Sequence, residues 1–132
     1  MTWQDIARTA LAGAENDTIP FPQSVAMLVA AGFDGYAVDF RHAARIYYRP
    51  DGETLRLETA PTAPVAALFD AAIVRDAIRA AQAMAPGYTY HGFCARVAGA
   101  GCAGYLVSFP GRRVLYYGRT GETHTEHFPG SP

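Results

Sequence analysis

Near the C-terminus, an imidazole and a carboxylate stand two positions apart, at His124 and Glu126. Residues 123–128 alternate in a pattern typical of a β-strand, so both side chains should lie on one face, about 7 Å apart. At that separation a neutral imidazole and a carboxylate can share a divalent metal or exchange a proton with a bound molecule. The spacing indicates a polar ligand pocket, a metal site, or a solvated edge strand whose polar residues oppose aggregation.

Other side chains capable of chemistry precede this strand. Tyr116 and Tyr117 should project from opposite faces of the neighbouring strand, one ring buried and the other available for contacts. Arg119 and Glu122 follow in a turn, where they could bind an anionic group. The candidate ligand-binding residues are Tyr116, Tyr117, Arg119, Glu122, His124 and Glu126. The candidate metal set is His124, Glu126 and His127, with His127 facing away from the other two on a regular strand.

The chain resembles itself when it is shifted by 69 residues, so that Ala31 falls on Ala100. Over positions 31–54, 11 of 24 residues are identical in the two copies, whereas composition alone would give about one or two. Such self-similarity predicts a repeated structural unit. Shared residues should serve the fold, and function should lie where the copies differ. The C-terminal strand differs most, because Leu55 and Leu57 of the first copy become His124 and Glu126 in the second.

Each copy shows two helical patterns followed by three strand patterns. Apolar residues at helical spacing predict helices over 2–15, 21–31, 70–85 and 89–100. Alternation and β-forming residues predict strands near 36–40, 45–49, 54–59, 104–109, 113–117 and 123–128. The predicted fold class is α+β, an internal duplication of an α-α-β-β-β unit with about four helices packed against antiparallel strands. The strands could form one sheet of six or two sheets of three.

A length of 132 residues, half of them hydrophobic, predicts a single domain over 1–132. Its two repeats, about 1–59 and 65–128, are joined by a short Pro/Ala linker and are too small to fold alone. Cys94 and Cys102 replace apolar residues of the first copy, which predicts small core residues rather than reactive thiols.

Charge and hydropathy exclude several classes of function. The net charge of −1 argues against nucleic-acid binding, which usually needs a basic surface. No apolar run approaches the roughly 18 residues of a membrane span. The N-terminal segment begins as a capped amphipathic helix rather than a signal peptide, which predicts a cytoplasmic protein.

Two blocks of the chain carry a resemblance to a known family. One holds Phe21-Pro22-Gln23, Ala31-Gly32 and Tyr47-Tyr48, and the other runs from Phe93-Cys94 to Gly121-Glu122-Thr123-His124. Together they resemble a small bacterial family of unknown function whose members are often labelled phage envelope protein. The resemblance implies a short single-domain protein and carries over no catalytic residue, because the family has none assigned. A phage-related structural role rests on that label alone.

Two functions from different classes fit these features. The first is a cytoplasmic binding or interaction module that uses the sheet face and the C-terminal strand. It would need no cofactor, would hold an unknown small ligand or protein partner, and would be a monomer or homodimer. The alternative is a small enzyme with His124 and Glu126 as an acid–base or metal-binding pair. The sequence favours the module, because it shows no nucleophile–base pair, phosphate loop or complete metal cluster.

Overall fold

A computed structural model describes residues 1–129 of the chain. The element order is α-α-β-β-β-α-α-β-β-β, so the α+β class predicted from the sequence is confirmed. The helices are α1 (Trp3–Glu15), α2 (Phe21–Ala30), α3 (Ala71–Gln82) and α4 (Tyr90–Gly99). The strands are β1 (Gly35–Asp39), β2 (Ala44–Tyr48), β3 (Thr54–Glu58), β4 (Cys102–Ser108), β5 (Arg113–Gly118) and β6 (Thr123–His127).

Helices α1, α3 and α4 begin where a side chain caps their free backbone N–H groups, whereas α2 begins after Pro20 without a side-chain cap. In α1 the Thr2 hydroxyl accepts from the Asp5 N–H at 3.1 Å, and the Asp5 carboxylate accepts from the Thr2 N–H at 3.2 Å, as a capping box requires. Asp70 and Thr89 cap α3 and α4 in the same way with one bond each.

Helix α3 ends three residues earlier than the predicted boundary at residue 85. Its last residue is Gln82, and Met84 adopts a positive φ of 48°. Pro86 disfavours helical backbone at the residue before it, so the chain turns away before the apolar pattern ends. The strand predicted from 104 begins instead at Cys102, because the Cys102–Gly104 segment continues pairing with β5 through an irregularity in register.

All six strands form one antiparallel sheet in the order β3-β2-β1-β4-β5-β6, which resolves the choice between one sheet and two. The two halves of the chain meet at β1 and β4, where Tyr36 pairs with Val107 and Val38 pairs with Tyr105. Ala37 and Leu106 pair at the centre of this register. The pairing is symmetric about that point, while the duplication itself stays a prediction from the sequence.

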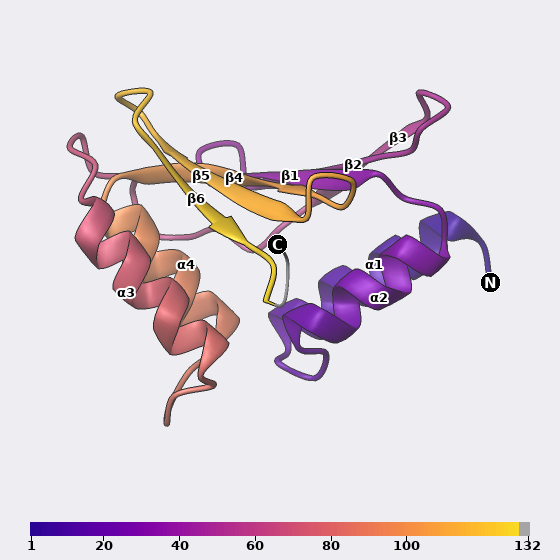
Figure 1. Ribbon diagram of the computed structural model, residues 1–132, viewed down its shortest axis with the longest axis horizontal. Coiled ribbons are helices and arrows are strands. Elements are labelled where there is room, and N and C mark those ends of the chain that lie inside the picture. The colour runs from indigo at the N-terminus through magenta and orange to yellow at the C-terminus, as the bar shows by residue number, and fades with distance from the viewer. Residues whose placement is uncertain (130–132) are drawn as a thin grey trace.

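The four helices lie on one face of the sheet as two pairs, α1 with α2 and α3 with α4 (Figure 1). Between them and the sheet lies the core, whose fully buried members include Leu28, Val74, Val97 and Val107. Burying side chains of this size contributes about 1.5–3 kcal/mol each, before the conformational entropy of ordering them is subtracted. No helix within residues 1–129 is long and apolar enough to cross a membrane.

Register across the sheet places polar groups in one row on the helix-facing side. Reading from β2 to β6, the paired residues are Arg45, Val38, Tyr105, Tyr116 and His124. The next row ends with Glu126, which pairs with Val114. Arg45 and His124, which are 79 positions apart in the sequence, therefore lie at the two ends of one row across the sheet.

Candidate functional site

A cleft of about 310 Å³ lies on the helix-facing side of the sheet, with residues from both helix pairs in its walls. Its floor includes Tyr36, Tyr105 and Tyr116, and its walls include Phe21 from α2 and Phe93 from α4. This volume is at the lower end of the range for small-molecule sites, which are mostly apolar with a few polar groups. The cleft is therefore the described cavity best suited to a small ligand.

Two contacts join the parts of the cleft wall. The Asp17 carboxylate, in the loop after α1, accepts a hydrogen bond from the backbone N–H of Tyr90 at 2.8 Å, at the first turn of α4, where the helix dipole favours a negative charge. The Phe21 and Phe128 rings meet edge to face, with centroids 5.9 Å apart. The α1–α2 pair is therefore tied both to α4 and to the segment that follows β6.

Arg45 lines this cleft although its side chain is almost fully buried, with 2% of its surface exposed. Its guanidinium donates to the hydroxyl of Tyr90 at 2.8 Å and to that of Tyr47 at 3.2 Å. It also lies 4.9 Å from the ring centroid of Tyr36 and 5.3 Å from that of Tyr90, within the range of cation–π attraction. A buried cation is thus held by aromatic faces and neutral hydroxyls.

The hydroxyl groups around Arg45 form a short chain. The Tyr90 hydroxyl, which accepts from Arg45, also lies 2.7 Å from the Tyr105 hydroxyl. Burial raises the pKa of Tyr36 to about 12, against the opposing effect of the Arg45 charge. Burial also holds the pKa of Tyr90 and of Tyr105 above their ordinary value. These three phenols therefore remain neutral at physiological pH.

His124 and Glu126, expected on one strand face, do come together. His124 Nε2 lies 3.0 Å from Glu126 Oε1, and the side chains expose 22% and 14% of their surface. Arg79 of α3 donates to the same carboxylate oxygen at 2.6 Å. Glu126 lines the cleft, whereas His124 is not among the described residues that do. The pair is therefore partly buried beside the cleft and ties β6 to α3.

The remaining candidates are divided between several places. Tyr116 is buried in the floor of the cleft, while Tyr117 lies on the other face, with its hydroxyl over Gly104. Arg119 donates to the Val65 carbonyl at 3.2 Å, and Glu122 is an exposed turn residue. The structure thus brings Tyr116, His124 and Glu126 together and leaves Tyr117, Arg119 and Glu122 outside the cleft.

The candidate metal set gains no further ligand from the fold. His127 is exposed, as the alternation of β6 requires, and contributes to the cleft lining from the end of the strand. Within residues 1–129, no group of three or more His, Cys, Asp or Glu residues is placed to hold a metal ion.

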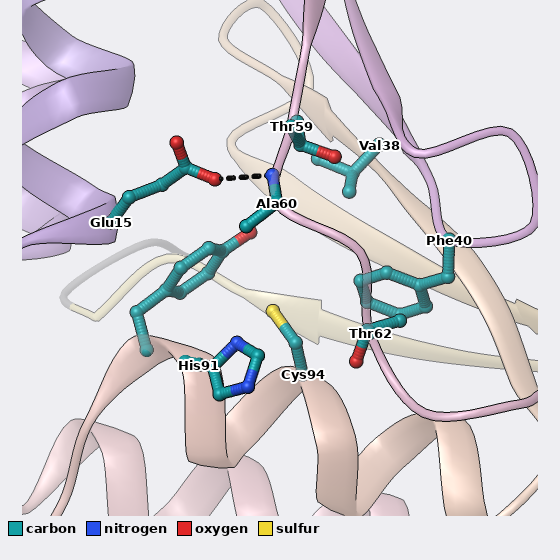
Figure 2. Close-up of a pocket in the computed structure, with 9 residues that line it drawn as sticks. Glu15, Val38, Phe40, Thr59, Ala60, Thr62, His91 and Cys94 are labelled. Atoms are coloured by element: carbon teal, nitrogen blue, oxygen red, sulfur yellow. Dashed lines mark hydrogen bonds between the residues drawn. The ribbon is translucent and has the colours of Figure 1, made fainter.

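A second, smaller pocket of about 140 Å³ shares Tyr90 with the cleft as a lining residue. Figure 2 shows the Cys94 sulfur directed into this pocket, and Glu15 hydrogen-bonded to the backbone N–H of Ala60 at 2.8 Å. His91 lies one helical turn before Cys94. Burial raises the pKa of the Cys94 thiol to about 11, so little of the nucleophilic thiolate forms at neutral pH.

Both thiols are expected to be unreactive in the folded protein. Cys94 and Cys102 are buried and unpaired, and burial raises the pKa of each to about 11. At neutral pH, Ellman's reagent should label neither cysteine in the native state and both in denaturant, since reaction requires an accessible thiolate. Rapid native labelling of Cys94 would contradict this expectation and would make the smaller pocket a candidate active site.

Arg45 is the functional candidate that the sequence analysis missed. One signal was present: Arg45 alternates with Tyr47, so a charged residue occupies the buried face of β2. The shift of 69 residues places Arg45 opposite Val114, an apolar residue that lines the same cleft. A charge in one copy and a valine in the other is a difference of the kind that marked His124 and Glu126.

Comparison with known families and proteins adds no relative. No protein-family model matches the chain, and no curated protein matches it. The resemblance to the family labelled phage envelope protein therefore stays a prediction, and the function is argued from the site itself.

Proposed function

We propose that this protein is a binding module for a small molecule, which it holds in the cleft between the two helix pairs. The observation that carries the proposal is the cleft itself, about 310 Å³ in volume and lined mainly by aromatic and aliphatic side chains. Its floor is the helix-facing side of the sheet and one end is formed by the C-terminal strand. A cavity of this volume with a mainly apolar lining suits a small molecule better than a protein partner.

Packing energetics support the same conclusion. Protein interiors are close-packed, and unfilled apolar volume costs stability because the lining atoms lose their contacts. The contacts of Asp17 with Tyr90 and of Phe21 with Phe128 connect the walls around this space and hold them apart. A ligand that fills the cleft would recover the lost contacts and stabilise the folded protein.

The enzyme alternative has weaker support. His124 directs its Nε2 atom at Glu126, and Glu126 is also bound by Arg79. The Glu126 carboxylate is therefore already bonded to His124 and Arg79, and His124 is not among the described residues that line the cleft. We therefore assign the pair a positioning role, in which β6 and α3 are held together at one end of the cleft.

The proposal is tested with a neutral dye, N-phenylnaphthylamine, whose fluorescence rises in apolar surroundings. The wild-type protein should bind it saturably at one site. Ala81→Trp should abolish binding, because Ala81 of α3 lines the cleft and an indole there would occupy it. Ala72→Trp is the matched control, since Ala72 lies exposed on the same helix and is not among the lining residues.

The outcome is decisive when both variants melt cooperatively near the wild-type temperature. Loss of dye binding in Ala81→Trp alone supports the cleft as the site. Equal binding by both variants, or no saturable binding by the wild type, would contradict the proposal.

A further inference from the structure

Arg45 carries a positive charge that no side chain of the described chain balances. Buried charges in proteins are normally paired, because transfer of an isolated ion from water is costly. The ion pairs formed within residues 1–129 do not include Arg45. Arginine cannot escape the cost by losing its proton, since it stays protonated at any ordinary pH. The folded protein therefore holds, in the lining of the cleft, a buried cation without a negatively charged partner among the described residues.

The neighbouring groups solvate this cation without neutralising it. Its hydrogen-bond partners are the hydroxyls of Tyr47 and Tyr90. Its Nε atom is buried and has no hydrogen-bond partner among the described residues. A buried donor without an acceptor costs about 1–3 kcal/mol. The site thus lacks both a negative charge and at least one acceptor.

The position of Arg45 in the cleft lining indicates that a bound ligand could supply the missing negative charge and acceptor. Arg45 lines the same cleft as the apolar rings of Phe21 and Phe93, so a ligand body between the helix pairs can reach the guanidinium. The linked hydroxyls of Tyr90 and Tyr105, 2.7 Å apart, lie beside it, and the one that does not donate to the other keeps its proton as a further donor. An anionic oxygen placed there would receive charge-assisted hydrogen bonds, which are about twice as strong as neutral ones.

We infer that the cleft selects a small carboxylate with an apolar, preferably aromatic, body, and that Arg45 binds the carboxylate. This inference rests on the proposed function of the cleft. One guanidinium balances a single negative charge, which favours a monocarboxylate over a phosphate dianion. Asp17 and Glu126 also line the cleft, and their charges would repel a second anionic group.

The test compares naphthaleneacetate with its carboxamide, two probes of nearly the same shape that differ in charge. Each is titrated into the protein by calorimetry and by displacement of the neutral dye. The wild type should bind the carboxylate about ten- to a hundredfold more tightly than the amide, as expected for a charge-assisted interaction. Arg45→Met should remove this preference by weakening the carboxylate alone, and Arg45→Lys should retain part of it.

Arg49→Met is the matched control, because Arg49 follows the same strand and is not among the lining residues of the cleft. It should keep the full preference for the carboxylate. Equal affinity of the wild type for both probes would overturn the inference about Arg45 while leaving a cleft that binds ligands. A preference that survives in Arg45→Met, or a failure of the carboxylate to displace the dye from the wild type, would overturn it as well. The proposed function itself would be contradicted by the dye experiment, through absence of saturable binding to the wild type or equal binding by Ala81→Trp and Ala72→Trp.

Discussion

Gly101→Ala is expected to destabilise the protein by about 3 kcal/mol or more, the largest effect that we expect from a single methyl group in this chain. Gly101 has a φ of +91°, and a Cβ atom there would lie 2.0 Å from the Leu68 carbonyl oxygen. That oxygen belongs to a backbone segment held by two hydrogen bonds to the end of α4, from Ala66 to Ala98 and from Asp70 to Ala100. The segment therefore cannot move aside cheaply.

Gly32→Ala is the matched control, because Gly32 lies 69 positions before Gly101 and has almost the same φ, +89°. There the nearest atom to an added Cβ is an Arg49 terminal nitrogen at 3.4 Å, the flexible end of a side chain. The cost should be about 1 kcal/mol, from the backbone conformation alone. Urea denaturation of the three proteins measures both losses. Equal losses would show that backbone strain, rather than the close approach of Leu68, dominates at Gly101.

This pair of glycines shows what local sequence can and cannot predict. The sequence places Gly32 and Gly101 at equivalent helix ends, and both do follow a helix with a positive φ. The difference between them comes from the segment around Leu68, which packs on one and has no counterpart on the other. Element type and order follow from periodicity and capping near each residue, whereas such contacts depend on the whole fold.

The candidate site also combines contacts that local sequence predicts with contacts that depend on the whole fold. The contact between His124 and Glu126 was predictable, because residues two apart on a strand share a face. The partnership of Glu126 with Arg79 was not, since α3 lies 47 positions earlier in the chain. The surroundings of Arg45 depend on more of the fold. Three antiparallel pairings place Arg45 in a row with Tyr105 and Tyr116, and α4 brings the Tyr90 hydroxyl into contact with it. No spacing in the sequence encodes that enclosure.

Arg45→Met is expected to stabilise the folded protein by about 1–2 kcal/mol, a gain of a few degrees in Tm. The substitution removes the desolvation penalty of a buried ion, several kcal/mol after relaxation, and replaces it with an apolar chain of similar length. Each opposing loss is smaller. The hydroxyls of Tyr47 and Tyr90 lose the guanidinium as a hydrogen-bond donor, and the rings of Tyr36 and Tyr90 lose their cation–π contacts, at about 1 kcal/mol each. The hydrogen bond between the hydroxyls of Tyr90 and Tyr105 remains.

Arg49→Met should have the opposite sign and destabilise the protein by about 1–3 kcal/mol. Arg49 donates to the Ala31 carbonyl at 2.8 Å and lies 4.6 Å from the Trp3 ring centroid, so it joins α1, α2 and the strand end. Its charge remains partly solvated, with 20% of the side chain exposed, and little desolvation is recovered by removing it. The two variants are compared by thermal and urea unfolding without ligand.

Opposite signs at two neighbouring arginines would separate structure from function in this fold. A stabilising Arg45→Met would mean that the chain maintains a buried cation at a cost to its folding stability, a trade-off common where a site serves binding. Losses of folding stability of similar size in both variants would instead give Arg45 a stabilising role among the tyrosines around it. With excess naphthaleneacetate present, the order should reverse, because only the protein with Arg45 gains the binding free energy of the carboxylate.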